Sequence, residues 1–145
     1  MKNHFFRLAI LALSFSLIFT GLALAQQAVG VVTALRGKAQ LTRATTKTAL
    51  SFKDDLNLRD VIDTQEKSLI RVLFGGKSTV TMRELSRLEV REELIPGGTT
   101  RTVYELSSGS ILVNVARSLM GRGDEVQIRT SNAVAAVRGS TILAQ

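Results

Sequence analysis

The chain of 145 residues contains no cysteine and no tryptophan, and it has one proline and one histidine. Without cysteine there is no disulfide to support the fold and no thiolate to act as a nucleophile or metal ligand. The one histidine, His4, lies in an apolar N-terminal segment, so the rest of the chain has neither residue. Because histidine and cysteine carry much of the proton transfer and nucleophilic chemistry near neutral pH, we expect no enzyme and no cofactor.

The first 25 residues differ from the rest of the chain. They consist of a short basic start, an apolar run from Leu8 to Leu24, and the small-residue sequence Ala23-Leu24-Ala25. This order is typical of a secretory signal peptide, so we predict a signal peptide at residues 1–25 with cleavage before Gln26. The protein is then periplasmic or secreted. An uncleaved segment would instead tether the domain to a membrane.

Charged clusters and aromatic residues are scarce after residue 25. Loss of the N-terminal segment lowers the net charge from +7 to +5, and the basic residues are scattered from Arg36 to Arg138. Such a distribution favours solubility and attraction to anionic envelope surfaces over nucleic-acid binding. Platforms that stack sugars or bases need several exposed rings on one face. We therefore expect core positions for the three aromatic residues of this region, which are Phe52, Phe74 and Tyr104.

Residues 26–145 are long enough for one domain with a single hydrophobic core. Apolar residues recur at alternate positions, and Gly, Asp, Asn and Ser separate the runs. This pattern predicts an all-β fold of short stacked antiparallel strands, either a β-solenoid or a sandwich. Helix is limited to one turn near residues 83–86, and residues 43–51 form a loop or a weak strand. The expected strands are 28–35, 38–42, 68–74, 79–82, 87–91, 101–106, 110–116, 125–129, 133–137 and 141–143.

The stretch Gly75-Gly76-Lys77-Ser78 resembles part of a phosphate-binding loop in composition. Such a loop needs a glycine five positions before Gly76, but that position is Arg71, so the spacing fails. The chain also repeats an order of threonine corner, strand, glycine corner and strand, first in residues 62–80 and again in residues 128–142. We therefore interpret the glycines as corner residues that supply backbone angles unfavourable for other residues. These glycines are Gly75, Gly76 and Gly139.

Two groups of acidic residues could take part in catalysis or metal binding: four glutamates that could pair across a hairpin, and the stretch 54–63. Carboxylates paired across a hairpin would leave a glycan-acting enzyme as an alternative function. Charges on alternating strands usually form a solvated face, however, and we favour that interpretation. The oxygen-rich stretch 54–63 lacks the glycine and terminal glutamate of a calcium loop, so we assign it to turns and strand ends and expect no metal site. The hairpin candidates are Glu89, Glu92, Glu93 and Glu105.

The most specific pattern lies near the C-terminus, where a threonine corner and small apolar residues precede Val137-Arg138-Gly139-Ser140-Thr141. This pattern resembles the FecR-type domain of bacterial envelope proteins, in which Val-Arg-Gly-Thr leads into a further strand. Ser140 stands where that family usually has threonine. Further matches are the sequence Arg36-Gly37-Lys38-Ala39, the turn at residues 106–110, and a glycine corner after an apolar strand. The motif residues are Thr130, Val137, Arg138, Gly139, Ser140, Thr141, Gly75 and Gly76.

The resemblance covers residues 28–143 and implies an all-β domain outside the cytoplasmic membrane, used for protein contacts in signalling or envelope organisation. In the signalling members, a cytoplasmic segment that handles a sigma factor precedes a membrane span, and the β domain receives a signal from an outer-membrane receptor. Only seven residues precede the apolar run here, so we expect a free-standing exported domain. Its expected function is non-catalytic binding or scaffolding through another envelope protein or a cell-wall polymer. The alternative is the periplasmic sensing part of a FecR-like transmembrane signalling system.

Two expectations concern the C-terminal corner. Arg138 lies between Val137 and Gly139, and we expect its guanidinium to bond backbone carbonyls or a carboxylate at the corner rather than a ligand. The sequence stops at Gln145, directly after an expected strand. Either the sequence is a fragment, or this strand leaves an exposed edge through which a partner or a second copy extends the sheet.

Overall fold

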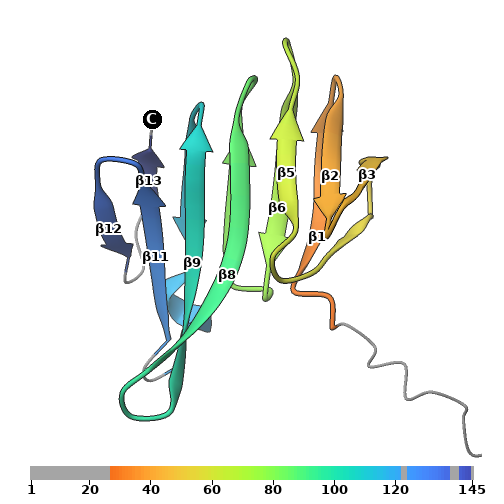
Figure 1. The fold of residues 1–145 in the computed structure, drawn as a ribbon. Coiled ribbons are helices and arrows are strands. Elements are labelled where there is room, and N and C mark those ends of the chain that lie inside the picture. Colours follow the sequence, from red (N-terminus) through yellow and green to blue (C-terminus); the bar gives the residue numbers. More distant parts are fainter. Residues whose placement is uncertain (1–26, 122–123, 138–140, 145) are drawn as a thin grey trace, which may run out of the picture.

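The computed structural model describes residues 27–121, 124–137 and 141–144, and it confirms the all-β prediction (Figure 1). The predicted signal peptide lies outside these residues. Two β-sheets form the described part, and its only helical element is one 3-10 turn, η2 (Arg117–Leu119). No helix within the described ranges is long and apolar enough to span a membrane. Residues 83–86, expected as a helical turn, instead make a tight turn in which Leu85 has a φ of 55°.

The two sheets contain six and seven strands, and we call them sheet A and sheet B. In spatial order, sheet A consists of β4 (Asp55–Leu56), β1 (Gly30–Arg36), β6 (Leu69–Phe74), β7 (Ser78–Met82), β10 (Ile111–Val115) and β13 (Thr141–Ala144). Sheet B consists of β3 (Thr46–Ala49), β2 (Ala39–Arg43), β5 (Val61–Thr64), β8 (Arg87–Ile95), β9 (Thr99–Ser108), β11 (Glu125–Thr130) and β12 (Val134–Val137).

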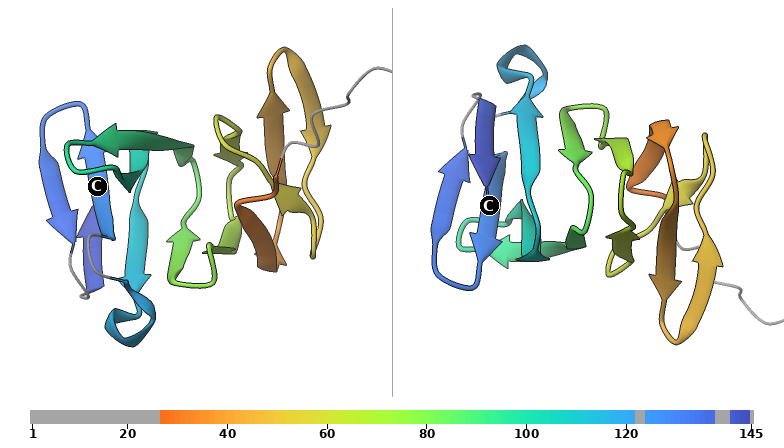
Figure 2. Two further views of the ribbon diagram at one scale, coloured as in Figure 1. Left: turned by 90° about the horizontal axis from the view of Figure 1, so that it is seen from below. Right: turned by 90° about the horizontal axis from the view of Figure 1, so that it is seen from above.

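The chain advances along both sheets from the end with β3 and β4 to the end with β12 and β13 (Figure 2). It changes sheet after every one or two strands, so strands close in sequence are also close in space. Neighbouring strands are antiparallel except β9 and β11, which are parallel because the chain passes through β10 of sheet A between them. The fold thus combines the facing sheets of a sandwich with the stepwise progress of a solenoid.

All ten predicted strands are present, and the main differences in length are that β8 continues to Ile95 instead of ending at Arg91 and that β9 covers Thr99–Ser108 instead of 101–106. Residues 43–51, expected as a loop or weak strand, contain β3, whose four side chains are exposed. The sequence did not predict β4 and β5. Both are short and lie in the stretch rich in Asp and Asn, which has the composition of turns.

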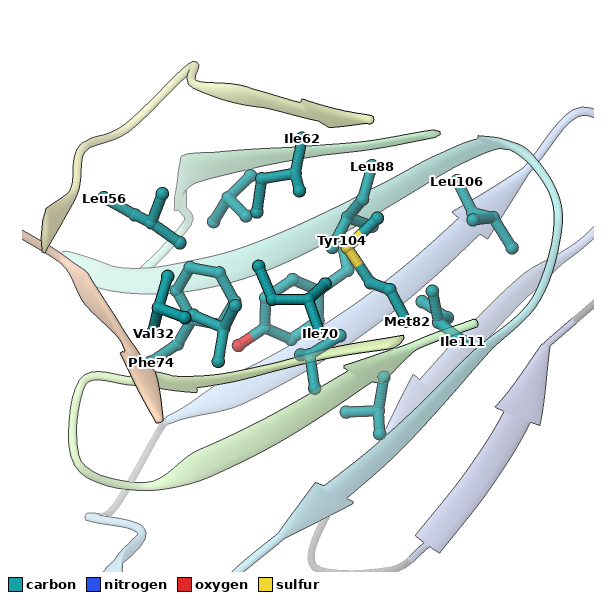
Figure 3. Close-up of a cluster of buried hydrophobic side chains, with 14 of the residues drawn as sticks. Val32, Leu56, Ile62, Ile70, Phe74, Met82, Leu88, Tyr104, Leu106 and Ile111 are labelled. Atoms are coloured by element: carbon teal, nitrogen blue, oxygen red, sulfur yellow. The ribbon is translucent and has the colours of Figure 1, made fainter. Parts of the chain in front are cut away.

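The core lies between the sheets and is formed by alternate side chains of both (Figure 3). Phe74 and Tyr104 are buried, which confirms two of the three predicted core aromatics, and their rings lie 5.3 Å apart at an angle of 49°. The prediction for Phe52 is wrong, because this side chain is 59% exposed. Leu50 occupies the buried position after β3, and the chain then turns outward with Lys53 at a φ of 72°.

Four corners between the sheets meet at the upper end of the molecule in Figure 1 and are tied together by two serine–glycine contacts. Ser68 Oγ accepts the Lys38 amide at 2.9 Å, and Ser86 Oγ accepts the Ser110 amide at 3.0 Å. The preceding glycines, Gly37 and Gly109, both have a φ of 80°, and an added Cβ would lie within 2.4 Å of the serine oxygen. We call these two contacts the serine–glycine clasps.

Thr64 joins the two clasps across the middle of this end. Its hydroxyl donates to the Arg83 carbonyl at 2.5 Å and accepts the Ser86 amide at 2.9 Å. The backbone amide of Thr64 in turn donates to the Ser86 carbonyl at 2.9 Å. Buried Thr64, Ser68 and Ser86 are therefore hydrogen-bonded, as buried polar groups must be if they are not to destabilise the fold.

Candidate functional site

The glycine corner singled out in the sequence is the hairpin turn between β6 and β7. Gly75 and Gly76 have φ values of 55° and 67°, in the left-handed region that favours glycine. Next to them, Lys77 Nζ lies 2.5 Å from Asp124 Oδ2, which also accepts the Gly121 amide at 2.8 Å. The hydrogen bonds from Lys77 and from Gly121 lower the pKa of Asp124. The lysine of this corner is thus held by a carboxylate from the start of β11.

The C-terminal motif is described only in part. Thr130 Oγ1 accepts the Ala133 amide at 3.1 Å and so stabilises the hairpin turn between β11 and β12. Val137 ends β12 opposite Val126, and Thr141 begins β13 opposite Asn114. The remaining motif residues lie outside the described residues, so the role assigned to Arg138 stays a prediction. These residues are Arg138, Gly139 and Ser140.

The repeat predicted between residues 62–80 and 128–142 does not correspond to two equivalent structures. The threonine corner at Thr64 carries the chain from sheet B to sheet A, whereas the corner at Thr130 is a hairpin within sheet B. The physical reason lies in the hydroxyl partners. Thr64 bonds a neighbouring corner through Arg83 and Ser86, but Thr130 bonds its own turn through Ala133.

Three of the four acidic hairpin candidates belong to an ion-pair network on the outer face of sheet B. Glu89 and Glu105 lie opposite each other on β8 and β9. Arg91 joins them, with Nε 2.7 Å from Glu89 Oε1 and Nη1 3.2 Å from Glu105 Oε2. Its hydrogen bond to Glu89 raises the pKa of Arg91. Glu93 pairs with Arg129 at 3.2 Å. These three carboxylates therefore match the expected solvated face.

The oxygen-rich stretch 54–63 serves turns and strand ends, as the sequence predicted. Buried Asp60 accepts the Asn57 amide at 2.7 Å and receives both Nε and Nη2 of Arg43, at 2.9 and 2.7 Å. The Asp60 hydrogen bond raises the pKa of Arg43. Asp63 pairs with Arg87 at 3.0 Å. Among the described residues, no group of three or more acidic or histidine side chains is placed to hold a metal ion.

A concave feature lies at the end of the sandwich opposite the serine–glycine clasps. It is a cavity of about 720 Å³ between the β6–β7 corner of sheet A and strands β8, β9 and β11 of sheet B, and we call it the end pocket. Tyr104 and Ser78 form a hydrogen bond between their hydroxyls at its buried wall. Most of the remaining wall is apolar. The apolar lining residues are Ala28, Val29, Leu58, Phe74, Val90, Met120 and Val126, and the uncharged polar ones besides Ser78 and Tyr104 are Gln27, Thr100 and Thr102.

Two charged side chains of the end pocket have no partner among the described residues. Arg59 and Glu92 both line it, and within the described part of the chain neither side chain has a hydrogen-bond or ion-pair partner. Arg59 has a φ of 66°, an unfavourable angle for a residue with a Cβ. Its amide donates to the Val90 carbonyl at 2.8 Å, and the adjacent Asp60 fixes the turn that carries it. The strained turn thus holds a free guanidinium at the pocket wall.

Residues 60–145 match the sequence model of the family described as FecR protein. The chain belongs to the FecR family. This match confirms the resemblance found in the sequence, and it covers β5 to β13, including the end pocket walls from β8, β9 and β11. FecR proteins are a non-enzymatic signalling and regulatory family associated with the cell envelope. No curated protein and no solved structure matches the chain.

In this FecR domain the residues of the end pocket were not found as a site from the sequence. Tyr104 was predicted to be buried, but its bond to Ser78 joins residues 26 positions apart on different sheets. Glu92 was grouped with its acidic neighbours, although its position in the alternation places it on the side of Val90, away from Glu89 and Glu93. This alternation of side chains along β8 was the one feature of the sequence that could have separated Glu92 from the other glutamates. Nothing in the sequence marked Arg59.

Proposed function

We propose that this FecR-family chain is an exported, non-catalytic binding domain that contacts another protein of the bacterial envelope in a sensing or signalling system. Membership of the FecR family is the observation that carries the proposal. Two further features support it. The N-terminal segment has the composition of a signal peptide, and the domain after residue 25 contains no histidine or cysteine.

The charge of the end pocket favours a protein partner over an anionic cell-wall polymer. A site for a polyanion needs several unpaired cations along one groove. In the end pocket, Lys77 is neutralised by Asp124 and Glu125 is paired with Arg101. Arg59 and Glu92 do not pair with each other but carry opposite charges that cancel in the sum. An apolar wall with balanced charges is typical of a surface that recognises polypeptide.

Two experiments test the proposal. The first measures export: fractionation of cells should place the protein outside the cytoplasm, and mass spectrometry should find a processed N-terminus at Gln26. Retention in the cytoplasm would contradict the proposal outright. An unprocessed chain found in the membrane fraction would support the tethered form of the same domain.

The second experiment tests for the partner. A photo-crosslinking amino acid is placed at Leu94, beside the end pocket, and in a control chain at Phe52; both side chains are exposed. We expect a discrete crosslinked protein from position 94 in intact cells and none from position 52. Equal crosslinking from both positions, or none from either, would argue against specific contact at this end of the molecule.

A further inference from the structure

We propose that the free edge of β8 beside the end pocket accepts an extended segment of the partner protein as an additional strand. One apolar side chain of that segment enters the pocket, and a neighbouring basic side chain meets Glu92. This inference rests on the proposed function, because it specifies how the partner is held.

The edge exists because β8 is much longer than its neighbour β5. β5 pairs with β8 only as far as Val61 opposite Glu89, whereas β9 pairs with β8 as far as Ile95 (Figure 1). We call Arg91–Ile95 the β8 overhang. No described strand lies beside it on the β5 side. The overhang is therefore a short free sheet edge, of the kind that partner strands extend.

The direction of the free backbone groups follows from one hydrogen bond. The Val90 carbonyl accepts the Arg59 amide and so points to the β5 side. Alternate residues of a strand present their amide and carbonyl groups to the same side. Glu92 and Leu94 therefore present their backbone groups at the free edge. The groups of the intervening residues face β9.

The side chains along this edge define what the added segment must carry. Leu94 is 80% exposed and lies on the same face of β8 as Val90 and Glu92, beside the apolar wall of the end pocket. An apolar side chain entering at this point would be covered by Leu94, Leu58 and Val90. The free carboxylate of Glu92 requires a cation next to it, because desolvating an unpaired charge is costly. At the end of the edge nearest β5, the Arg59 amide already occupies the Val90 carbonyl, so the added strand cannot extend past this point.

Charge also argues against a second copy of this chain as the occupant. Antiparallel pairing of two β8 overhangs would place both Glu92 carboxylates on the same face of the paired strands, where like charges destabilise the contact. The β3 edge is a weaker candidate for an added strand. β3 is exposed along its whole length, but none of its residues lines the end pocket. A partner segment with a basic residue is the occupant that fits the end pocket.

Selection from a phage library of random heptapeptides on the purified processed protein tests this inference. We expect enrichment of extended peptides in which apolar residues alternate with a lysine or arginine. Leu94→Pro removes the edge amide without removing an amide that bonds β9, so it should weaken binding of a selected peptide at least tenfold. Leu94→Ala keeps the amide and should weaken it less. Glu92→Gln should weaken only peptides that carry the basic residue.

Lys47→Pro is the matched control for the proline substitution. The Leu50 amide donates to Ala39 of β2, so by alternation the Lys47 amide faces away from β2 and is equally dispensable for the sheet. This variant should bind the selected peptide like the wild type. Circular dichroism and melting temperature verify that both proline variants are folded.

Hydrogen exchange on the unaltered protein provides a second test that needs no variant. The amides of Glu92 and Leu94 should exchange quickly in the free protein and become protected when a selected peptide is bound. Failure to enrich any peptide, full binding by Leu94→Pro, or unchanged exchange at these two amides would each overturn the inference. A partner crosslinked at position 94 together with any of these results would leave the proposed function standing and remove only the added strand.

Discussion

Tyr104 is the only tyrosine of the chain, so its ionisation can be followed without interference. Burial raises the pKa of its phenol well above the ordinary value of about 10, and the hydrogen bond with Ser78 offsets only part of that rise. A raised pKa means that Tyr104 contributes stability below about pH 10, and that this contribution is lost as the pH rises further. We expect no tyrosinate absorbance from the folded protein at pH values where the unfolded chain is already half ionised.

The control is the same titration in denaturant, which should show an ordinary midpoint near pH 10. The melting temperature should fall steadily above that pH. A folded protein that titrates together with the denatured chain would show that water reaches the Tyr104 hydroxyl, and that the wall of the end pocket is open on this side.

Lys77 and Asp124, which also line the end pocket, allow a second titration. The Lys77 hydrogen bond is the main cause of the lowered Asp124 pKa, followed by the Gly121 amide. Lys77→Met removes the first cause and keeps the second, so NMR titration should show the pKa of Asp124 rising toward, but not reaching, its ordinary value of about 4. Because both groups are partly exposed, the change in unfolding free energy should be under about 1 kcal/mol. An unchanged Asp124 pKa would mean that the ion pair does not form in solution.

The lowered pKa of Asp124 also fixes the sign of the pH effect. Its contribution to stability is present above the unfolded pKa of about 4 and is lost as the pH falls through the folded value. The stability of wild type and Lys77→Met should therefore converge in acid.

The corners between strands depend on the two serine–glycine clasps. At Gly109, an added Cβ would meet Ser86 Oγ at 2.3 Å and Ser86 Cα at 2.5 Å, and the φ of 80° is unfavourable for alanine. Gly97 in the β8–β9 turn has a φ of 103° but open space around it. We expect Gly109→Ala to lower the unfolding free energy by about 3 kcal/mol and Gly97→Ala by about 1 kcal/mol.

Chemical denaturation of both variants measures this difference, because they share the backbone penalty and differ only in the clash. Similar losses from both would mean that the corner at Gly109 moves away from Ser86 without much cost. A loss at Gly97 larger than that at Gly109 would contradict the packing of the clasp itself.

The elements show where the sequence was sufficient for prediction and where it was not. Alternation of apolar residues located ten strands, since burial of one face leaves a mark at every second position. In the predicted strand 87–91, Leu88 and Val90 alternate with charged residues, and both are buried. Alternation could not find β4 and β5, because β4 has only two residues and both strands lie in the stretch rich in Asp and Asn, which has the composition of turns.

The site was less predictable than the strands because its residues come from distant parts of the chain. Gly37 and Gly109 belong to stretches that resemble FecR-type sequences, but their contacts with Ser68 and Ser86 depend on which corners become neighbours. Arg59 and Glu92 also come together only in the folded chain: both line the end pocket, at the place where β8 extends beyond its pairing with β5. Pairing of sheets over long sequence distances is not encoded in any local pattern.

The order of strands in the domain predicts a gradient of local stability. Each strand contacts mainly its neighbours along the two sheets, as in repeat proteins, so opening can begin at an end without unfolding the middle. The side chains of β3 are all exposed, whereas Ile70, Val72, Val80 and Met82 in β6 and β7 are fully buried. Native-state hydrogen exchange should find the fastest amides in β3 and the slowest in β6 and β7, with exchange of the slowest amides limited by global unfolding. Equal protection in β3 and β6 would show instead that the two sheets open as one cooperative unit.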